Sequence, residues 1–349
     1  MKKTTSGHLS HTVVGRRIKC KLTDGPLPLI GLFLYFTFFL STGCVAQQRT
    51  LLVLSKGDHT LAIVDPASLK VMAKVPVGSD PHEVIASSDG KTAYVSIYGG
   101  GDLHTLNVID LIAQKPLFNI DTRPLFGPHG LAFAGGKVWF SAEGSKSVGR
   151  YDPATKKLDW SMGTGQDRTH MIYVTPDQKH VYTTNVNSGT VSLLTAGPRQ
   201  EWSQTVISVS KGSEGFDVSP DGRQLWTVSA DDGSIAVIDL AAQKTVATID
   251  AKISGANRLK FTPDGRRVLA SSLKTGDLYV FEVASRKELT QIKIGHGGAG
   301  ILIAPDGSRA FVGCTPDNYV AVIDLKTLKV VDHIDVGKSP DGLAWAVRQ

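Results

Sequence analysis

The chain has 349 residues and a formal net charge of +6, with 41% hydrophobic and 20% charged residues. This length suits two average domains or one large all-β domain, and the composition allows a sizeable buried core. Residues 1–46 hold six Lys and Arg against one acid. The rest of the chain is therefore nearly neutral, which argues against a nucleic-acid partner and assigns the basic charge to targeting.

Residues 1–46 have the pattern of a signal peptide. A basic region precedes twelve apolar residues at positions 29–40, "LIGLFLYFTFFL", a run shorter than the roughly 20 residues of a membrane span. The next stretch, "LSTGCVAQQ", resembles a bacterial lipoprotein signal in which Cys44 is lipidated and becomes the N-terminus. Ser41 stands where such signals usually carry Leu, so ordinary cleavage after Ala46 is the alternative.

This segment predicts an exported protein whose mature domain spans residues 47–349. We expect it to be periplasmic or anchored to a bacterial membrane through a lipid on Cys44. Cys314 is the one cysteine that follows this boundary. A single thiol cannot form an internal disulfide, so the core alone must stabilise the domain.

A pattern of four short strands recurs through the remaining chain. Residues 213–249, "SEGFDVSPDGRQLWTVSADDGSIAVIDLAAQKTVATI", alternate apolar and polar positions between turns that contain Asp and Gly. Such alternation is typical of antiparallel strands joined by tight hairpins. Similar units recur at intervals of 41 to 47 residues, which is typical of the blades of a β-propeller.

The two ends of the repeat region complement each other. The last unit, which starts at "PDGLAW", reaches only its first strand, whereas residues 49–75 supply only a second, third and fourth strand. Together these parts make one blade. The sequence therefore predicts an all-β, seven-bladed β-propeller with four-stranded antiparallel blades, closed by pairing of the C-terminal inner strand with the three N-terminal strands.

One position at the start of each first strand carries mostly polar residues. Because first strands line the channel of a propeller, we expect these seven residues to form a ring at one channel mouth. In chain order the ring consists of His82, His129, His170, Glu214, Asn257, Ala299 and Asp341. Three adjacent histidines followed by a carboxylate mark one side of this mouth as the candidate site.

His82, His129, His170 and Glu214 are also a candidate site for a divalent metal cofactor. Imidazole binds zinc, copper, iron or nickel, and three protein ligands with an open position are typical of catalytic zinc. Such a metal would polarise a carbonyl or activate water. Two alternatives stay open, namely metal-free acid–base catalysis by a histidine oriented by Glu214 or Asp341, and a structural or ligand-lining role.

Other polar residues lie beside the ring in the sequence. Arg258 is expected to face an anionic ligand or to pair with Glu214, and Tyr98 of "IYGGGD" is a candidate lid. Glu143 of "WFSAEG" is either functional or a solvated loop acid. The catalytic candidates are His129, His170, Glu214 and Glu143. The ligand-binding candidates are His82, His129, His170, Glu214, Asn257, Arg258 and Asp341.

The repeats resemble the YVTN β-propeller family, also described as lactonase-like or surface-layer-type propellers. The likeness rests on "SPDGRQLWTVSADDGSIAVIDL", "TPDGRRVLASS" and "APDGSRAFVGCTPDNYVAVIDLKTLKVV". It covers nearly all of residues 51–349 and implies the fold, but the family has many functions. One unit, "GPHGLAFAGGKVWFSAEGSKSVGRYDPAT", is similar to repeats of the streptogramin lyases, metal-dependent propellers that open a cyclic ester. That likeness implies a functional role for Glu143.

Two functions follow from these observations. The first is an exported binding or scaffold propeller that presents its polar mouth to a small molecule or a protein partner. The second is a metal-dependent or histidine-based lactonase or lyase that acts on a cyclic ester. In both cases a lipid on Cys44 is the only membrane contact that we expect.

Overall fold

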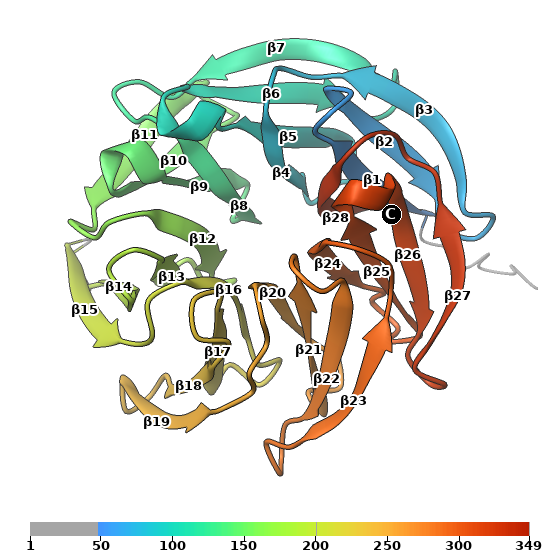
Figure 1. Ribbon diagram of the computed structural model, residues 1–349. Helices are drawn as coiled ribbons and strands as arrows, with labels where there is room; N and C mark the ends of the chain where they lie inside the picture. Colours follow the sequence, from blue (N-terminus) through green and yellow to red (C-terminus); the bar gives the residue numbers. More distant parts are fainter. Residues whose placement is uncertain (1–47, 200, 349) are drawn as a thin grey trace, which may run out of the picture. The chain divides into compact units, whose positions relative to one another are not determined.

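The computed structural model describes residues 48–199 and 201–348. The predicted signal segment and its Cys44 lie outside this part of the chain. The described residues form seven four-stranded antiparallel sheets, which follow one another around a common centre (Figure 1). The predicted all-β, seven-bladed propeller is confirmed. Within the described chain, no helix is both long and apolar enough to cross a membrane.

Blades 2 to 7 each use four consecutive strands, ordered from the inner to the outer edge. Blade 2 consists of β4 (Pro81–Ala86), β5 (Thr92–Ile97), β6 (Thr105–Asp110) and β7 (Lys115–Asp121). Blade 3 consists of β8 (Pro128–Ala134), β9 (Lys137–Ala142), β10 (Ser147–Asp152) and β11 (Lys157–Gly163). Blade 4 consists of β12 (Thr169–Val174), β13 (His180–Asn185), β14 (Thr190–Ala196) and β15 (Trp202–Ser208). Blade 5 consists of β16 (Ser213–Val218), β17 (Gln224–Ser229), β18 (Ile235–Asp239) and β19 (Lys244–Ile249). Blade 6 consists of β20 (Ala256–Phe261), β21 (Arg267–Ser272), β22 (Asp277–Glu282) and β23 (Glu288–Lys293). Blade 7 consists of β24 (Gly298–Ile303), β25 (Arg309–Cys314), β26 (Tyr319–Asp324) and β27 (Lys329–Ile334). Three short 3-10 helices follow second strands, namely η1 (Gly99–Gly101), η2 (Glu143–Ser145) and η3 (Thr315–Asp317).

Blade 1 joins the two ends of the described chain. Its strands, from the inner edge, are β28 (Pro340–Arg348), β1 (Gln48–Ser55), β2 (Thr60–Asp65) and β3 (Lys70–Pro76). β28 pairs antiparallel with β1 in a register that places Gln48 opposite Arg348 and Val53 opposite Leu343. The predicted closure is therefore present, and β28 covers the edge of β1 that would otherwise be unpaired.

The hydrophobic core is divided among the interfaces between neighbouring blades. Second and third strands are buried along most of their length, as in β2 and β17, because blades pack against both of their faces. Outer strands such as β19 alternate exposed and half-buried residues. One interface cluster packs Trp226 of blade 5 against Leu259, Phe261 and Val268 of blade 6. Burial between blades explains why the inner halves of the repeats are the most apolar.

Each inner strand begins with the same backbone irregularity. The ring residue and its successor together oppose a single residue of the second strand, which is a β-bulge. In all seven blades the residue two positions before the ring residue has a positive φ. These residues are Asp80, Gly127, Arg168, Gly212, Gly255, Gly297 and Ser339. This repeated turn and bulge direct the ring side chains into the channel mouth.

Candidate functional site

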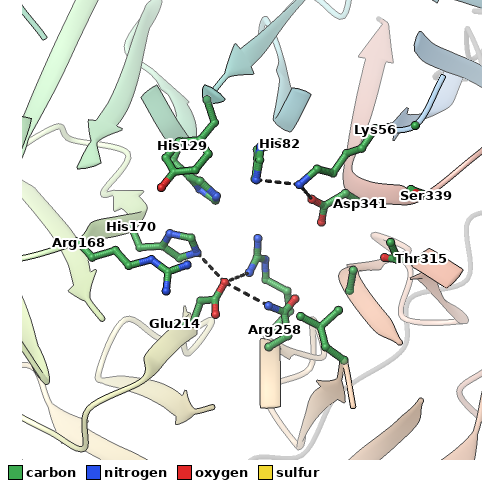
Figure 2. Close-up of a pocket in the computed structure, with 15 residues that line it drawn as sticks. Lys56, His82, His129, Arg168, His170, Glu214, Arg258, Thr315, Ser339 and Asp341 are labelled. Carbon is green, nitrogen blue, oxygen red and sulfur yellow. Dashed lines mark hydrogen bonds and ion pairs between the residues drawn. The ribbon is translucent and has the colours of Figure 1, made fainter. Parts of the chain in front are cut away.

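All seven predicted ring residues line one cavity of about 500 Å³ at the channel mouth (Figure 2). Each is the second residue of its inner strand, so the shared turn and bulge bring side chains from seven blades to one level. Arg258 also lines the cavity, as the sequence predicted for a ligand-binding residue. The arrangement therefore places the whole predicted ligand-binding set around one hollow.

Hydroxyl groups on the second strands hold the ring residues in place. Ser96 Oγ accepts a hydrogen bond from the bulge N–H of Glu83 at 3.0 Å and donates to the carbonyl of His129 in the next blade at 2.7 Å. The same arrangement recurs at Ser141, Thr184 and Ser271. The bulge leaves these backbone groups outside the ladder, so the hydroxyls satisfy them and tie adjacent blades together.

His170 lies between the buried carboxylate of Glu143 and the largely buried carboxylate of Glu214. Its Nδ1 is hydrogen bonded to Glu143 Oε1, and its Nε2 to Glu214 Oε1 at 2.9 Å. Burial opposes a charge on the ring, but the attraction of Glu214 and the hydrogen bonds to both carboxylates outweigh it and raise the pKa of His170. With an acceptor at each nitrogen, the ring is an imidazolium that donates on both sides.

Glu143 is buried, with 4% of its side chain exposed, so its interpretation as a solvated loop acid was wrong. It begins η2 and accepts a hydrogen bond from Tyr98 Oη at 2.5 Å in addition to the bond from His170. Burial raises the pKa of Glu143, yet the bond from His170 more than compensates and lowers it. Glu143 therefore lies behind the cavity wall and fixes two of the residues that form it.

Glu214 and Arg258 form the floor of the charge cluster. Glu214 Oε1 accepts hydrogen bonds from His170, from Asn257 Nδ2 at 3.2 Å and from Arg258 Nη1 at 3.4 Å. Burial opposes this charge, but His170 and Arg258 lower the pKa of Glu214 well below its usual range. Arg258 also donates from Nη2 to Glu83 Oε1 at 2.7 Å. The predicted pairing of Arg258 with Glu214 is present, and Glu83 is a second partner.

The ring of His129 packs against three neighbouring rings in tilted or edge-on contacts. Its ring centroid lies 3.9 Å from that of His170, 4.8 Å from His82 and 5.2 Å from Tyr98. Among the described residues, Nδ1 of His129 has no hydrogen-bond partner. Burial and the nearby His170 charge hold the pKa of His129 well below its ordinary value. His129 is thus a neutral imidazole beside a charged one.

His82 is held in one tautomer by Lys56. The Lys56 ammonium donates to His82 Nε2 at 2.8 Å, which leaves Nδ1 to donate to the Asp80 carbonyl at 3.2 Å. Burial, followed by the Lys56 charge, lowers the pKa of His82. Lys56 also lies 3.5 Å from Asp341 Oδ2. This pair closes the side of the mouth opposite Arg168 in Figure 2.

A second ring of side chains surrounds the first, and sequence reasoning did not identify it as a ring. It consists of the residues that directly follow the second strands: Lys56, Tyr98, Glu143, Val186, Ala230, Leu273 and Thr315. Lys56, Tyr98, Leu273 and Thr315 line the cavity. Their constant place after the second strand is the sequence pattern that would have revealed Lys56. Arg168, also missed, directly precedes the "TH" that opens β12.

The donor set fits an ion-pair cluster better than a metal centre. Among the described residues, His129, Glu143 and His170 are the group that could hold a metal, with ligand atoms within 4.8 Å of one another. This group shares two members with the predicted metal set and leaves out His82 and Glu214. A metal on His170 would have to replace one of its two bonds to carboxylates, and a metal on His82 Nε2 would displace Lys56.

Comparison with known proteins finds one propeller family that matches part of the chain. Residues 151–306 match the model of the YNCE-like beta-propeller family. The resemblance to lactonase-like propellers is confirmed at the level of the fold, because solved neighbours include two proteins described as "putative 6-phosphogluconolactonase". The likeness of one blade to streptogramin lyase repeats stays a prediction.

Three solved structures illustrate the likeness. A functionally unknown protein from Desulfotomaculum acetoxidans has a TM-score of 0.72 at 12% identity, over 85% of this chain and 98% of its own. The Bacteroides uniformis "putative 6-phosphogluconolactonase" has a TM-score of 0.72 at 15% identity, over 85% of this chain and 99% of its own. Kuenenia stuttgartiensis hydrazine synthase has a TM-score of 0.66 at 20% identity, over 76% of this chain and 89% of its own. No curated protein matches the sequence. Such low identities show a shared fold only.

The histidine cluster predicts a stability maximum near pH 6.5. The pKa of His170 is raised in the folded protein, whereas in the unfolded chain it has its ordinary value of 6.5. Above pH 6.5 the unfolded chain therefore loses a proton that the folded protein keeps, and the free energy of unfolding falls as the pH rises. The pKa values of His129 and His82 are lowered in the folded protein. Below pH 6.5 the unfolded chain therefore binds protons that the folded protein does not bind, and the free energy of unfolding falls as the pH decreases.

Urea unfolding at pH values from about 5 to 9 measures this effect, and each group contributes a slope of up to about 1.4 kcal/mol per pH unit. The variant His170→Gln should lose the decline on the alkaline side, and His129→Gln should weaken the decline on the acid side. An alkaline decline of unchanged slope in His170→Gln would contradict the assignment of His170 as an imidazolium.

Proposed function

We propose that the protein is a binding propeller whose channel mouth takes up a small polar molecule. The observation that carries the proposal is the state of the three histidines. His170 is hydrogen bonded to Glu143 and Glu214 through its two nitrogens, burial lowers the pKa of His129, and His82 accepts a hydrogen bond from Lys56. A catalytic acid or base must change its protonation near neutral pH. Side chains fixed in this way suit recognition by a rigid, preorganised surface instead.

We further propose that the protein is exported and works outside the cytoplasm, in the periplasm or on a lipid anchor at Cys44. The supporting observation is the order of a basic region, a short apolar run and a candidate cleavage site in residues 1–46.

Blocking the cavity tests the binding proposal. Thr315 lies at the mouth in η3, whereas Thr327 lies in the turn after β26, at the far end of the same blade. In a saturation-transfer NMR screen with anionic, neutral and cationic fragments, we expect binding to the protein and to Thr327→Trp, and loss of that binding in Thr315→Trp. Fragments that bind all three proteins equally, or the absence of any binding fragment, would contradict the proposal.

A lactonase or lyase is the second candidate, because His129, Glu143 and His170 form a group that could hold a metal. It differs from the binding proposal in requiring bound metal or turnover. Metal analysis of the purified protein beside a His82/His129/His170 triple alanine variant separates the two. Equal metal content in both proteins, together with unchanged hydrolysis of lactones and esters, would leave the binding function as the better account.

A further inference from the structure

We propose that the ligand of the channel mouth is a small organic anion with an apolar body. Its carboxylate or phosphate would lie between Arg168 and His129, and its body would lie against Leu273 and Ala299. This inference rests on the proposed function and adds the chemical class of the ligand. It follows from the distribution of charge, unused hydrogen-bonding groups and apolar surface around the cavity.

The wall that faces the cavity carries more positive than negative groups. Its cations are Lys56, Arg168, Arg258 and the imidazolium of His170, and its anions are Glu214 and Asp341. Glu143 and Glu83 do not line the cavity, since they pair with these cations from behind. Glu214 already accepts three hydrogen bonds, and Asp341 pairs with Lys56. The cations are engaged too, because His170 and Arg258 each donate to two carboxylates and Lys56 donates to His82. Arg168 is therefore the main charged donor left to meet a ligand, which suits an anion.

Arg168 is the least engaged of the cations. It is 39% exposed, and its ion pair with Glu143 Oε2 is long, at 3.7 Å. Figure 2 shows its guanidinium directed into the cavity beside His170 and Glu214. A planar guanidinium placed in this way can bind a carboxylate or phosphate through two hydrogen bonds.

The backbone position of Arg168 indicates that its side chain is kept for a purpose. Its φ is +58°, a left-handed conformation that favours glycine, and four of the six equivalent positions in the other blades are glycine, the other two being Asp80 and Ser339. A side chain costs roughly 1 to 2 kcal/mol there. An arginine that faces the cavity from such a position is more readily explained by a ligand than by folding.

His129 provides a second, independent indication of a ligand. The residue is 98% buried, since only 2% of its surface is exposed, and its Nδ1 has no partner among the described residues. Figure 2 shows the ring directed into the cavity between His82 and His170. A buried polar nitrogen without a partner costs about 1 to 3 kcal/mol. A ligand that reorders this side of the mouth would offer it one.

The opposite side of the mouth is less polar. Leu273 is 45% exposed although it lines the cavity, and the ring position of blade 7 is filled by Ala299. These residues belong to blades 6 and 7, whereas His129 and Arg168 belong to blades 3 and 4. An apolar group beside the anion would cover Leu273, and a cavity of about 500 Å³ has room for both parts.

A matched series of compounds tests the inference. The probes are benzoate, phenyl phosphate, benzamide and benzylamine, with the four corresponding naphthalene compounds, measured by saturation-transfer NMR and calorimetry. We expect the anions to bind at least about tenfold more tightly than the amides, and the naphthalene anions more tightly than the benzene anions. Comparison of the carboxylates with the phosphates identifies the head group.

Two glycine variants separate binding from folding. Arg168→Gly should be at least as stable as the parent protein, because glycine suits φ +58°, yet it should lose the preference for anions over amides. Arg286 also has a φ of +58° but lies in the turn between β22 and β23, at the far end of its blade. Arg286→Gly should therefore keep the preference. Leu273→Ser should reduce the advantage of the naphthalene compounds.

Three results would overturn the inference: an anion preference that survives in Arg168→Gly, tighter binding of the amides or amines, or no binding by any probe at millimolar concentration. The second result is distinguishable from failure of the proposed function. Amides or amines that bind the protein but not Thr315→Trp would show a binding mouth of a different charge preference.

Discussion

A chain shortened to end at residue 339 is expected to lose its cooperative fold. The deletion removes β28, the inner strand of blade 1, whose residues from Leu343 to Arg348 pair with β1. It exposes the edge of β1 and removes the packing of Trp345 against Phe311 of blade 7. Because a domain is stabilised by about 5 to 15 kcal/mol in total, loss of a whole strand from a closed ring should exceed what the fold can tolerate.

Circular dichroism during thermal unfolding measures this effect. A chain ending at residue 348, which keeps all of β28, is the matched control and should unfold at the temperature of the parent protein. A synthetic peptide of residues 340–349 should restore a cooperative transition to the shortened chain. A shortened chain with an unchanged transition would show that closure through β28 contributes little to stability.

The variant Arg258→Met is expected to cost about 3 to 5 kcal/mol of stability. Arg258 is buried and pairs with Glu83 and Glu214, and these attractions outweigh burial and raise the pKa of Arg258 above its usual range. Its removal takes a cationic partner from two largely buried carboxylates. Glu214 keeps His170 and Asn257, but Glu83 loses its ion-pair partner, so most of the cost should come from Glu83.

Lys260 on the same strand provides the control. It lies 3.6 Å from Asp217 and is about one-third exposed, so Lys260→Met should cost less than about 1 kcal/mol. The double variant Glu83→Gln with Arg258→Met should recover at least about 1 kcal/mol relative to Arg258→Met alone. Denaturant unfolding that shows equal costs for Arg258→Met and Lys260→Met would contradict a buried charge network at the mouth.

The fold and the ring could be predicted because both depend on periodic features of one chain. Alternation within strands, Asp and Gly turns and the incomplete units at the two ends determine seven blades and their closure. The ring followed from one constant position, and all seven residues from His82 to Asp341 line the cavity. Repeat proteins allow this kind of inference since each unit repeats the geometry of its neighbours.

The partners of these residues could not be predicted in the same way. Glu143 and His170 lie in different blades, and their bond depends on how two blades pack, not on any spacing within a repeat. The same holds for Arg258, whose partner Glu83 is 175 positions away. Three histidines at adjacent ring positions suggested a metal site. In the structure, however, His170 is hydrogen bonded to two carboxylates and His82 is hydrogen bonded to Lys56.

Arg168 shows how a departure from the repeat can carry information. The equivalent position is glycine in four blades, for a backbone reason that the sequence alone does not reveal. The left-handed φ shows that a side chain is strained there, as it also is at Asp80 and Ser339 in two other blades. The two sides of the mouth then differ in a physical sense, since Arg168 of blade 4 offers free donors, whereas Leu273 of blade 6 and Ala299 of blade 7 add apolar surface beside Asn257 and Arg258.

The central claim is that the channel mouth binds a small molecule through a preorganised surface. The most direct measurement compares fragment binding by the parent protein, Thr315→Trp and Thr327→Trp under identical conditions. The account predicts that the parent protein and Thr327→Trp bind the same fragments and that Thr315→Trp binds none of them. Undiminished binding by Thr315→Trp would place the interaction elsewhere and contradict the account.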